Sequence, residues 1–270
     1  RNGYTTLLQE QNGFAGLTNR LVAGNATHIC CGFPQMDAFF PAGKWSFTGN
    51  PVRQNIIDLV DRDNPANQAA VRARFGLQPN LPVVFVTGGS LGARTINEAL
   101  FVGLVTLAKA GVQVIWQMGL PFAKTHGEAI NQLINDHGDV FLQEGSPRIF
   151  HAPFIYDMDD AYLASDVVIS RAGAISISEI AVVGRAAVLV PSPNVTDDHQ
   201  TKNARVLSDL GAAILVTDKM ASETLITETL ALLKDTKKQA EMQEKLKGIA
   251  KPSATETIVN IIETCLQKGG

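Results

Sequence analysis

Regular alternation of short apolar runs with helical patterns, from residue 68 onward, constrains this fold more than any other feature of the sequence. Strands separated by helices of this length form parallel βαβ units, and right-handed crossovers put helices on both faces. The sequence therefore predicts an α/β fold with a doubly wound parallel sheet. Apolar runs predict strands at residues 82–87, 112–116, 140–142, 152–155, 167–170, 187–191 and 213–216. Helical spacing predicts helices at residues 68–75, 97–110, 124–136, 156–164, 176–183, 200–210 and 226–233.

The two ends of the chain carry further elements. Strands are expected at 5–8, 27–31 and 45–48, with a helix at 17–23 between the first two. Residues 49–53 are expected to turn, because a residue before proline avoids the helical region and Asn50 precedes Pro51. Near the other end, Ser253 and Glu256 have the spacing of a capping box. The helix that they start has one apolar stripe, made of Ile258, Ile261, Ile262, Cys265 and Leu266.

Composition excludes several classes of protein. The 270 residues suit one large domain or two small ones. A net charge of −3 gives no basic surface for nucleic acid, and the hydrophobic fraction of 45% argues against disorder. No apolar run approaches the ~18 residues of a membrane span. Three cysteines cannot build a disulfide framework, and Cys30 and Cys31 beside His28 are too crowded for a zinc site. We expect reduced thiols, no metal and a cytoplasmic protein.

A glycine-rich loop, Gly88-Gly89-Ser90-Leu91-Gly92-Ala93, follows one predicted strand and precedes a helix. Backbone N–H groups in such a loop can approach an anion, and the helix N-terminus adds partial positive charge. A diphosphate is the natural ligand, although a simple tight turn fits too. The loop is neither G-x-G-x-x-G nor a P-loop. Gln117, rather than an acidic residue, follows the next predicted strand, which argues against NAD.

Two further loops follow predicted strands. In residues 170–179, Glu179 either complements the helix dipole or accepts hydrogen bonds from a vicinal diol such as a ribose. In residues 191–203, Gln200 can donate to and accept from sugar hydroxyls, while Asp197 and Asp198 can simply cap a helix. Three such loops at the carboxyl ends of strands in one parallel sheet suit a nucleotide-diphosphate-sugar.

Five segments together resemble the MurG family of glycosyltransferases, which belongs to glycosyltransferase family 28. They are residues 9–19, 49–53, 88–93, 171–179 and 198–204, in the family's order and with compatible spacing. The resemblance implies a GT-B architecture of two Rossmann-like lobes with the donor between them. It divides the chain into a remnant of the N-terminal, acceptor-side lobe (1–50), a C-terminal UDP-GlcNAc-binding lobe (51–252) and a helix that returns to the N-terminal lobe (253–270).

The activity that this resemblance implies is an inverting transfer of GlcNAc from UDP-GlcNAc. The acceptor would be the 4-hydroxyl of MurNAc in undecaprenyl-linked lipid I, and the product would be lipid II for peptidoglycan synthesis. The resemblance implies no cofactor, and none of the residues present here requires a bound metal. The family works on the cytoplasmic face of the membrane as a peripheral protein, where other cell-wall enzymes are expected partners.

The resemblance also implies roles for individual residues. Ile155 would hold uracil through its backbone, Arg53 would support the nucleotide, and Glu179 would bind the ribose. Asn12 and Gln200 would touch the sugar. Ser90 would bind the phosphate within a loop that includes Gly88, Gly89 and Gly92. The donor would be lined by Ala174, Ile175, Ser176, Ile177, Ser178 and Glu179.

Departures from the family pattern are small except at the front. Ala172 stands where a small hydroxyl residue is common, and Ala186 replaces a usual proline. The resemblance implies an N-terminal lobe larger than residues 1–50, with the catalytic base in the part that is absent here. We therefore expect a fragment that binds the donor without catalysing transfer, and we assign no catalytic residue. Two alternatives stay open: an enzyme like UDP-GlcNAc 2-epimerase, and a nucleotide-sugar-binding module without catalysis.

Overall fold

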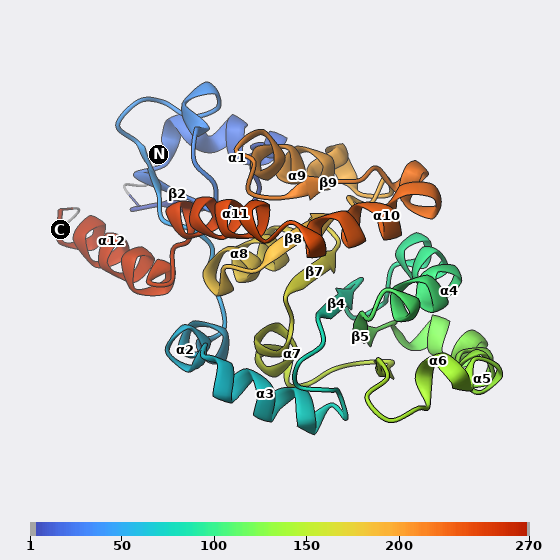
Figure 1. The fold of residues 1–270 in the computed structure, drawn as a ribbon. Helices are drawn as coiled ribbons and strands as arrows, with labels where there is room; N and C mark the ends of the chain where they lie inside the picture. The colour runs from blue at the N-terminus through green and yellow to red at the C-terminus, as the bar shows by residue number, and fades with distance from the viewer. Residues whose placement is uncertain (1–3, 269–270) are drawn as a thin grey trace.

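The computed structural model describes residues 4–268 and contains two parallel sheets (Figure 1). A small sheet has the order β1-β2-β3, and a large sheet has the order β6-β5-β4-β7-β8-β9. The small sheet comprises β1 (Leu7–Glu10), β2 (His28–Cys31) and β3 (Trp45–Phe47). The large sheet comprises β4 (Val83–Thr87), β5 (Gln113–Gln117), β6 (Ile149–Ala152), β7 (Val167–Ser170), β8 (Ala186–Leu189) and β9 (Ile214–Leu215).

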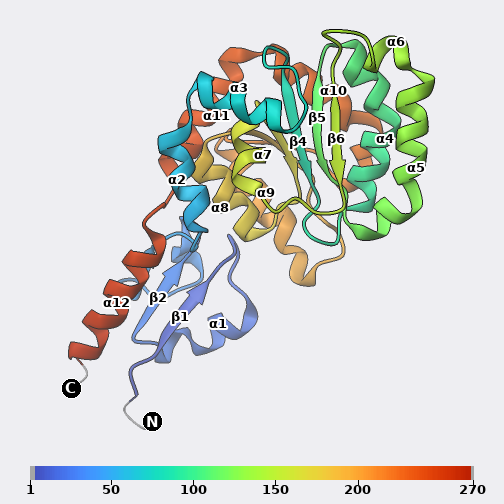
Figure 2. The same ribbon diagram turned by 90° about the horizontal axis from the view of Figure 1, so that it is seen from below.

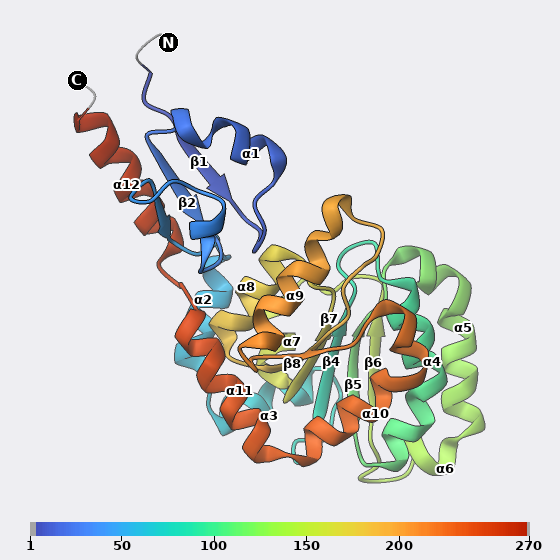
Figure 3. The same cartoon turned by 90° about the horizontal axis from the view of Figure 1, so that it is seen from above.

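Helices cover both faces of the large sheet (Figure 3). Successive side chains of β4 enter opposite cores: Val83 and Phe85 pack on one face, and Val84 and Val86 pack on the other. The first core is covered by α2 (Gln54–Arg62), α3 (Pro65–Arg74), α7 (Met158–Ala164), α8 (Ala174–Val183), α9 (His199–Asp209) and α11 (Thr236–Ile249). The second is covered by α4 (Arg94–Lys109), α5 (Leu120–Asp136), α6 (Gly138–Phe141) and α10 (Ala221–Lys234). The predicted doubly wound α/β fold is confirmed.

The small sheet has its own core and lies at one end of the molecule (Figure 2). Helix α1 (Leu17–Val22) connects β1 to β2, and α12 (Ala254–Lys268) lies beside β2. Within the apolar stripe predicted for α12, Ile258, Ile261 and Cys265 are half-buried, whereas Ile262 and Leu266 are exposed. The predicted segments 1–50 and 253–270 extend beyond the described residues at 1–3 and 269–270.

Two predicted elements differ from the structure around the sixth strand. Residues 140–142 were expected to form a strand, but they lie in and after α6, which packs on α4 and α5 and buries Phe141. A three-residue apolar run cannot distinguish the two structures. The strand expected at 152–155 lies earlier, at Ile149–Ala152, because Pro153 has no N–H to continue the ladder.

Helices α2 and α11 were absent from the sequence prediction. Residues Ile56 and Leu59 of α2 are fully buried at helical spacing, so a signal was present. Helix α11 buries only Met242 and Leu246 among its fourteen residues, and so few apolar positions give little periodicity. Within residues 4–268, no helix is both long and apolar enough to cross a membrane.

Candidate functional site

Loops that follow the large sheet's strands meet along its carboxyl edge, because every strand pair in that sheet is parallel. The strand order also reverses at β4, with β5 on one side and β7 on the other. Such a switch point at the carboxyl edge is where open α/β sheets bind ligands. All three loops selected from the sequence lie along this edge.

The loop between β4 and α4 can be built only with glycine at its key positions. A Cβ on Gly88 would lie 2.2 Å from the Ala93 nitrogen, and one on Gly92 would lie 2.2 Å from the Met118 carbonyl oxygen. Gly89 and Gly92 also have positive φ values of +81° and +78°. The tight loop leaves Ser90 exposed, and its hydroxyl has no hydrogen-bond partner within residues 4–268. A sixteen-residue helix starts directly behind it, which favours an anion there.

The loop between β7 and α8 is held by Arg171. Its Nη1 donates to the carbonyl oxygens of Val190 and Pro191 at 3.1 and 3.2 Å, and it pairs with Asp218. The backbone of this loop is thereby fixed against the end of β8. Ala174 begins α8, and Ser176 is half-buried.

The side chains predicted to line the donor on α8 do not all face the same way. Ile175 is 38% exposed, whereas Ile177 is 2% exposed and packs in the first core. The Ile177 N–H also donates to the Gly173 carbonyl at 2.9 Å, so neither its side chain nor its N–H is open to a ligand. The Ser178 hydroxyl donates to the Ala174 carbonyl at 2.9 Å and accepts from Asn50 Nδ2 at 3.1 Å.

Glu179 lies at the centre of a polar cluster in which Glu179 and Tyr162 are buried and Arg53 is half-exposed. Its Oε1 accepts from Arg53 Nε at 3.0 Å and from Arg53 Nη2 at 2.8 Å, and its Oε2 accepts from the Tyr162 hydroxyl at 3.3 Å. Burial, and then the Glu179 carboxylate, raise the pKa of Tyr162 well above its ordinary value, so the hydroxyl remains a donor. Glu179 is the sixth residue of α8, beyond the first turn, so its interpretation as a helix-start charge is wrong.

Ile155 follows β6 at the same edge and has a buried side chain. Its N–H already donates to Gln117 Oε1 at 2.9 Å, which leaves carbonyl groups of this segment to meet a base. The neighbouring Phe154 and Tyr156 are exposed, and their ring centroids are 4.9 Å apart.

The loop between β8 and α9 has an unusual backbone. Asp197 and Asp198 have φ values of 55° and 52°, a left-handed conformation that costs energy in residues other than glycine. Asp198 is the N-cap residue of α9, but neither side chain makes a capping hydrogen bond, so the predicted side-chain capping is wrong. Gln200 Oε1 accepts from the Ser192 N–H at 2.9 Å and thereby holds the loop against the helix.

Asn203 joins the small sheet's first loop to this edge and was not singled out from the sequence. Its side chain is fully buried, accepts from the Gly13 N–H at 2.8 Å, and donates to Asn12 Oδ1 at 3.1 Å and to the Ala172 carbonyl at 3.2 Å. Asn12 is thus held near the loop before α8. The sequence feature that could have identified Asn203 is its position one helical turn after Gln200, on the same face of α9.

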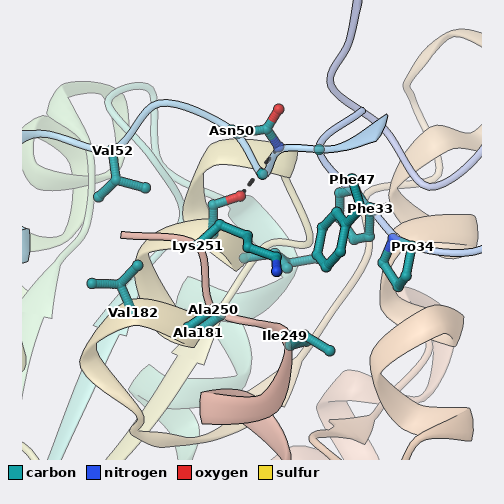
Figure 4. A pocket seen from close by; sticks show the side chains of 14 residues that line it. Phe33, Pro34, Phe47, Asn50, Val52, Ala181, Val182, Ile249, Ala250 and Lys251 are labelled. Carbon is teal, nitrogen blue, oxygen red and sulfur yellow. Dashed lines mark hydrogen bonds between the residues drawn. The ribbon is translucent and has the colours of Figure 1, made fainter. Parts of the chain in front are cut away.

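A small cavity lies where two chain segments pass between the sheets, and its lining is drawn in Figure 4. Phe47 and Asn50 come from one segment and Lys251 from the other, with Lys251 Nζ lying 4.7 Å from the Phe47 ring centroid. At about 20 Å³ the cavity has room for a water molecule but not for a nucleotide. The carboxyl edge is therefore the better candidate site. Within residues 4–268, no cluster of three or more His, Cys, Asp or Glu could hold a metal ion.

Comparison with known proteins gives the family. The glycosyltransferase family 28 C-terminal domain matches residues 83–258, which contain the whole large sheet. The chain belongs to glycosyltransferase family 28. This match confirms the family resemblance drawn from the five sequence segments.

Curated relatives of this family 28 chain share one name, UDP-N-acetylglucosamine--N-acetylmuramyl-(pentapeptide) pyrophosphoryl-undecaprenol N-acetylglucosamine transferase. The protein of Cytophaga hutchinsonii is 43% identical over 259 residues, covering 96% of this chain and 65% of that protein. The protein of Parabacteroides distasonis is 40% identical over 266 residues, covering 98% of this chain and 68% of that protein. The chain thus spans about two-thirds of the length of the curated relatives that it matches.

Solved structures agree with this family 28 assignment. The crystal structure of Acinetobacter baumannii MurG matches with a TM-score of 0.73 and 32% identity, covering 96% of this chain and 68% of that one. This match confirms the expected GT-B type of fold. A putative UDP-N-acetylglucosamine 2-epimerase from Listeria monocytogenes matches with a TM-score of 0.61 and 14% identity, which shows a shared fold and no more.

Proposed function

We propose that this chain carries the UDP-GlcNAc-binding part of an enzyme that transfers GlcNAc to the MurNAc 4-hydroxyl of lipid I, giving lipid II. The observation that carries the proposal is the 43% identity, over 96% of the chain, to a transferase of that name. The glycine loop and the buried Glu179 cluster at one sheet edge support it, because their chemistry suits a diphosphate and a ribose diol.

In this proposal the donor lies along the carboxyl edge of the large sheet. The diphosphate meets the backbone N–H groups of residues 88–92 and the Ser90 hydroxyl, at the positive end of α4. The ribose hydroxyls donate to Glu179, and the base meets the backbone around Ile155. The sugar lies near Asn12 and Gln200, which approach this edge from the small sheet and from α9 respectively.

Chemistry follows from that arrangement. The acceptor hydroxyl oxygen attacks C1 of GlcNAc and loses its proton to solvent, the bond from C1 to the β-phosphate oxygen breaks, and negative charge moves onto the departing UDP. Preorganised N–H donors and the α4 dipole stabilise that charge as it develops, which lowers the barrier. Arg53, half-exposed and paired with Glu179, adds a positive charge near the nucleotide. We assign no general base to residues 4–268.

The acceptor determines where such an enzyme works. Lipid I is held in a membrane by its undecaprenyl chain, so we propose that the complete transferase, of which this chain carries the donor-binding part, acts as a peripheral protein on the cytoplasmic face. There it would meet other cell-wall enzymes. Co-sedimentation with vesicles that contain lipid I tests this, and equal sedimentation with and without lipid I would contradict a specific acceptor.

One experiment separates the proposal from the 2-epimerase alternative. The chain is incubated with radiolabelled UDP-GlcNAc, with and without a short-chain lipid I analogue, and UDP binding is measured by calorimetry. We expect UDP to bind, and UDP-GlcNAc alone to give neither an epimer nor free UDP. Epimerisation, or UDP release without acceptor, would support the alternative. Absence of UDP binding at millimolar concentration would contradict the proposal.

A further inference from the structure

Gln117 connects two segments of the candidate site that are far apart in the sequence. It is the last residue of β5, which lies between β4 and β6, and its side chain is buried. Its Oε1 accepts from the Ile155 N–H at 2.9 Å. Its Nε2 donates to Thr87 Oγ1 at 3.2 Å and to the Gly89 carbonyl at 3.1 Å. One amide thus contacts both the base segment and the glycine loop.

These hydrogen bonds fix the directions of two peptide groups. A trans peptide points its C=O and N–H in opposite directions, and no cis peptide occurs within the described residues. Because the Gly89 carbonyl is drawn inward to Gln117, the Ser90 N–H of the same peptide points outward. Because the Ile155 N–H is drawn inward, the Phe154 carbonyl points outward. The first peptide presents a donor and the second presents an acceptor.

We propose that Gln117 is a positioning residue that sets these two peptides for the two ends of a uridine diphosphate. The inference rests on the proposed function. A phosphate needs donors such as the Ser90 N–H, and the N3–H of uracil needs an acceptor such as the Phe154 carbonyl. Gln117 touches neither ligand group and acts through both peptides, so its loss weakens the binding of both the uracil and the phosphate.

The same strand offers a matched control. Gln113 begins β5 at the opposite edge of the sheet and is also fully buried. Its Oε1 accepts from the Gln78 N–H at 2.7 Å, and its Nε2 donates to the carbonyls of Gln78 and Leu81 at 2.8 and 3.3 Å. Gln113 makes as many side-chain hydrogen bonds as Gln117, although both of its Nε2 bonds go to carbonyls, and they lie at the sheet edge opposite the glycine loop.

Thr87 separates the two halves of the effect. Its Oγ1 accepts from Gln117 Nε2 and from the Gly89 N–H. This hydroxyl makes no hydrogen bond to residues 154–156, which are proposed to meet the base. Thr87→Val therefore loosens the phosphate side alone, whereas Thr87→Ser keeps the hydroxyl.

The test measures melting temperature, and affinity for uridine and for UDP by calorimetry, in five proteins: the unmodified chain, Gln117→Met, Gln113→Met, Thr87→Val and Thr87→Ser. We expect Gln117→Met to lose about tenfold for uridine, since one hydrogen bond is worth about that factor, and about 30- to 100-fold for UDP, which loses the phosphate side as well. Gln113→Met lowers the melting temperature but changes neither affinity by more than about twofold. Thr87→Val loses about three- to tenfold for UDP with uridine unchanged, and Thr87→Ser recovers UDP binding.

Two results overturn the inference, and they are distinguishable. If the unmodified chain binds no UDP at millimolar concentration, the proposed function fails and the inference fails with it. If the chain binds UDP but Gln117→Met binds both ligands as well as Gln113→Met does, the positioning role fails while the proposed function stands. Should Gln117→Met not fold, an unchanged ratio of UDP to uridine affinity in Thr87→Val would be the overturning result.

Discussion

The two edges of the large sheet differ in how completely their polar groups are paired. At the amino edge, Arg72 donates to the carbonyls of Ala164 and Pro79 at 2.9 Å each, and to both Asp166 oxygens at 2.9 and 3.0 Å. Asp166 also accepts from the Val83 N–H at 2.7 Å. At the carboxyl edge, the hydroxyls of Ser90 and Ser176 have no partner within residues 4–268.

This difference separates stability from ligand binding. A buried polar group whose donor and acceptor sites are all taken gains nothing from a ligand, whereas an open donor on a rigid loop gains a partner at little cost in entropy. Substitutions at the amino edge should therefore reduce stability and leave affinity unchanged. Substitutions of the open hydroxyls at the carboxyl edge should reduce affinity and leave stability unchanged.

The largest effect is expected at the amino edge. Arg72→Ala should lower the free energy of unfolding by about 3–5 kcal/mol, because it leaves Asp166 without its buried partner. Urea denaturation measures this loss. UDP affinity of the folded variant should stay within about twofold of the original, since the groups that Arg72 bonds lie at the sheet edge opposite the candidate site. A tenfold loss of affinity would break the proposed separation. Lys237→Ala, in an exposed ion pair, is the control and should unfold like the original protein.

Glu179→Ala is expected to give the largest loss of ligand affinity. It removes the proposed acceptor of the ribose hydroxyls, and UDP binding should weaken roughly 10–100-fold. Calorimetry with UDP gives the value. Glu179→Gln keeps an acceptor without the charge, so its UDP affinity should lie between those of the unmodified chain and Glu179→Ala. Unchanged affinity in folded Glu179→Ala would remove this residue from the site.

Ser90→Ala should give a smaller and more selective change. Losing one hydroxyl donor to phosphate should weaken UDP binding about three- to tenfold and leave uridine binding unchanged. The melting temperature should not move, because the exposed hydroxyl has no protein partner within the described residues. A drop in melting temperature with unchanged UDP affinity would assign Ser90 a structural role instead.

The smallest expected effect is the pH dependence of stability from His151. Burial lowers the pKa of His151 below its ordinary value of 6.5, so the unfolded chain takes up its proton more readily than the folded chain. The His151 contribution to stability is thus complete above pH 6.5 and is lost as pH falls through the lowered pKa. Melting temperatures between pH 5 and 7.5 should decline less steeply in His151→Gln. An identical slope would contradict this.

Features that depend on local pattern could be predicted from the sequence. The loops at 88–93 and 171–179 were found because small residues follow apolar runs, and the structure has both at strand-to-helix turns. The strand predicted at 140–142 was wrong, because three apolar residues fit a buried helical turn as well as a strand.

Residues whose role depends on distant partners could not be found in this way. Gln117 contacts Ile155, which is 38 positions away, and Asn203 contacts Asn12, which is 191 positions away. Both amides look like surface residues in the sequence, since amides are mostly exposed in proteins. Gln117 and Asn203 become buried and form these hydrogen bonds only when separate strands and loops pack together in the fold. The site roles carried over from the family resemblance remain predictions.

A crystal structure of this chain with UDP would show directly whether the donor lies along the carboxyl edge of the large sheet. We expect the diphosphate over residues 88–92, the ribose hydroxyls on Glu179, and the base beside residues 154 and 155. UDP bound elsewhere on the molecule, or a diphosphate without contact to residues 88–92, would contradict this expectation.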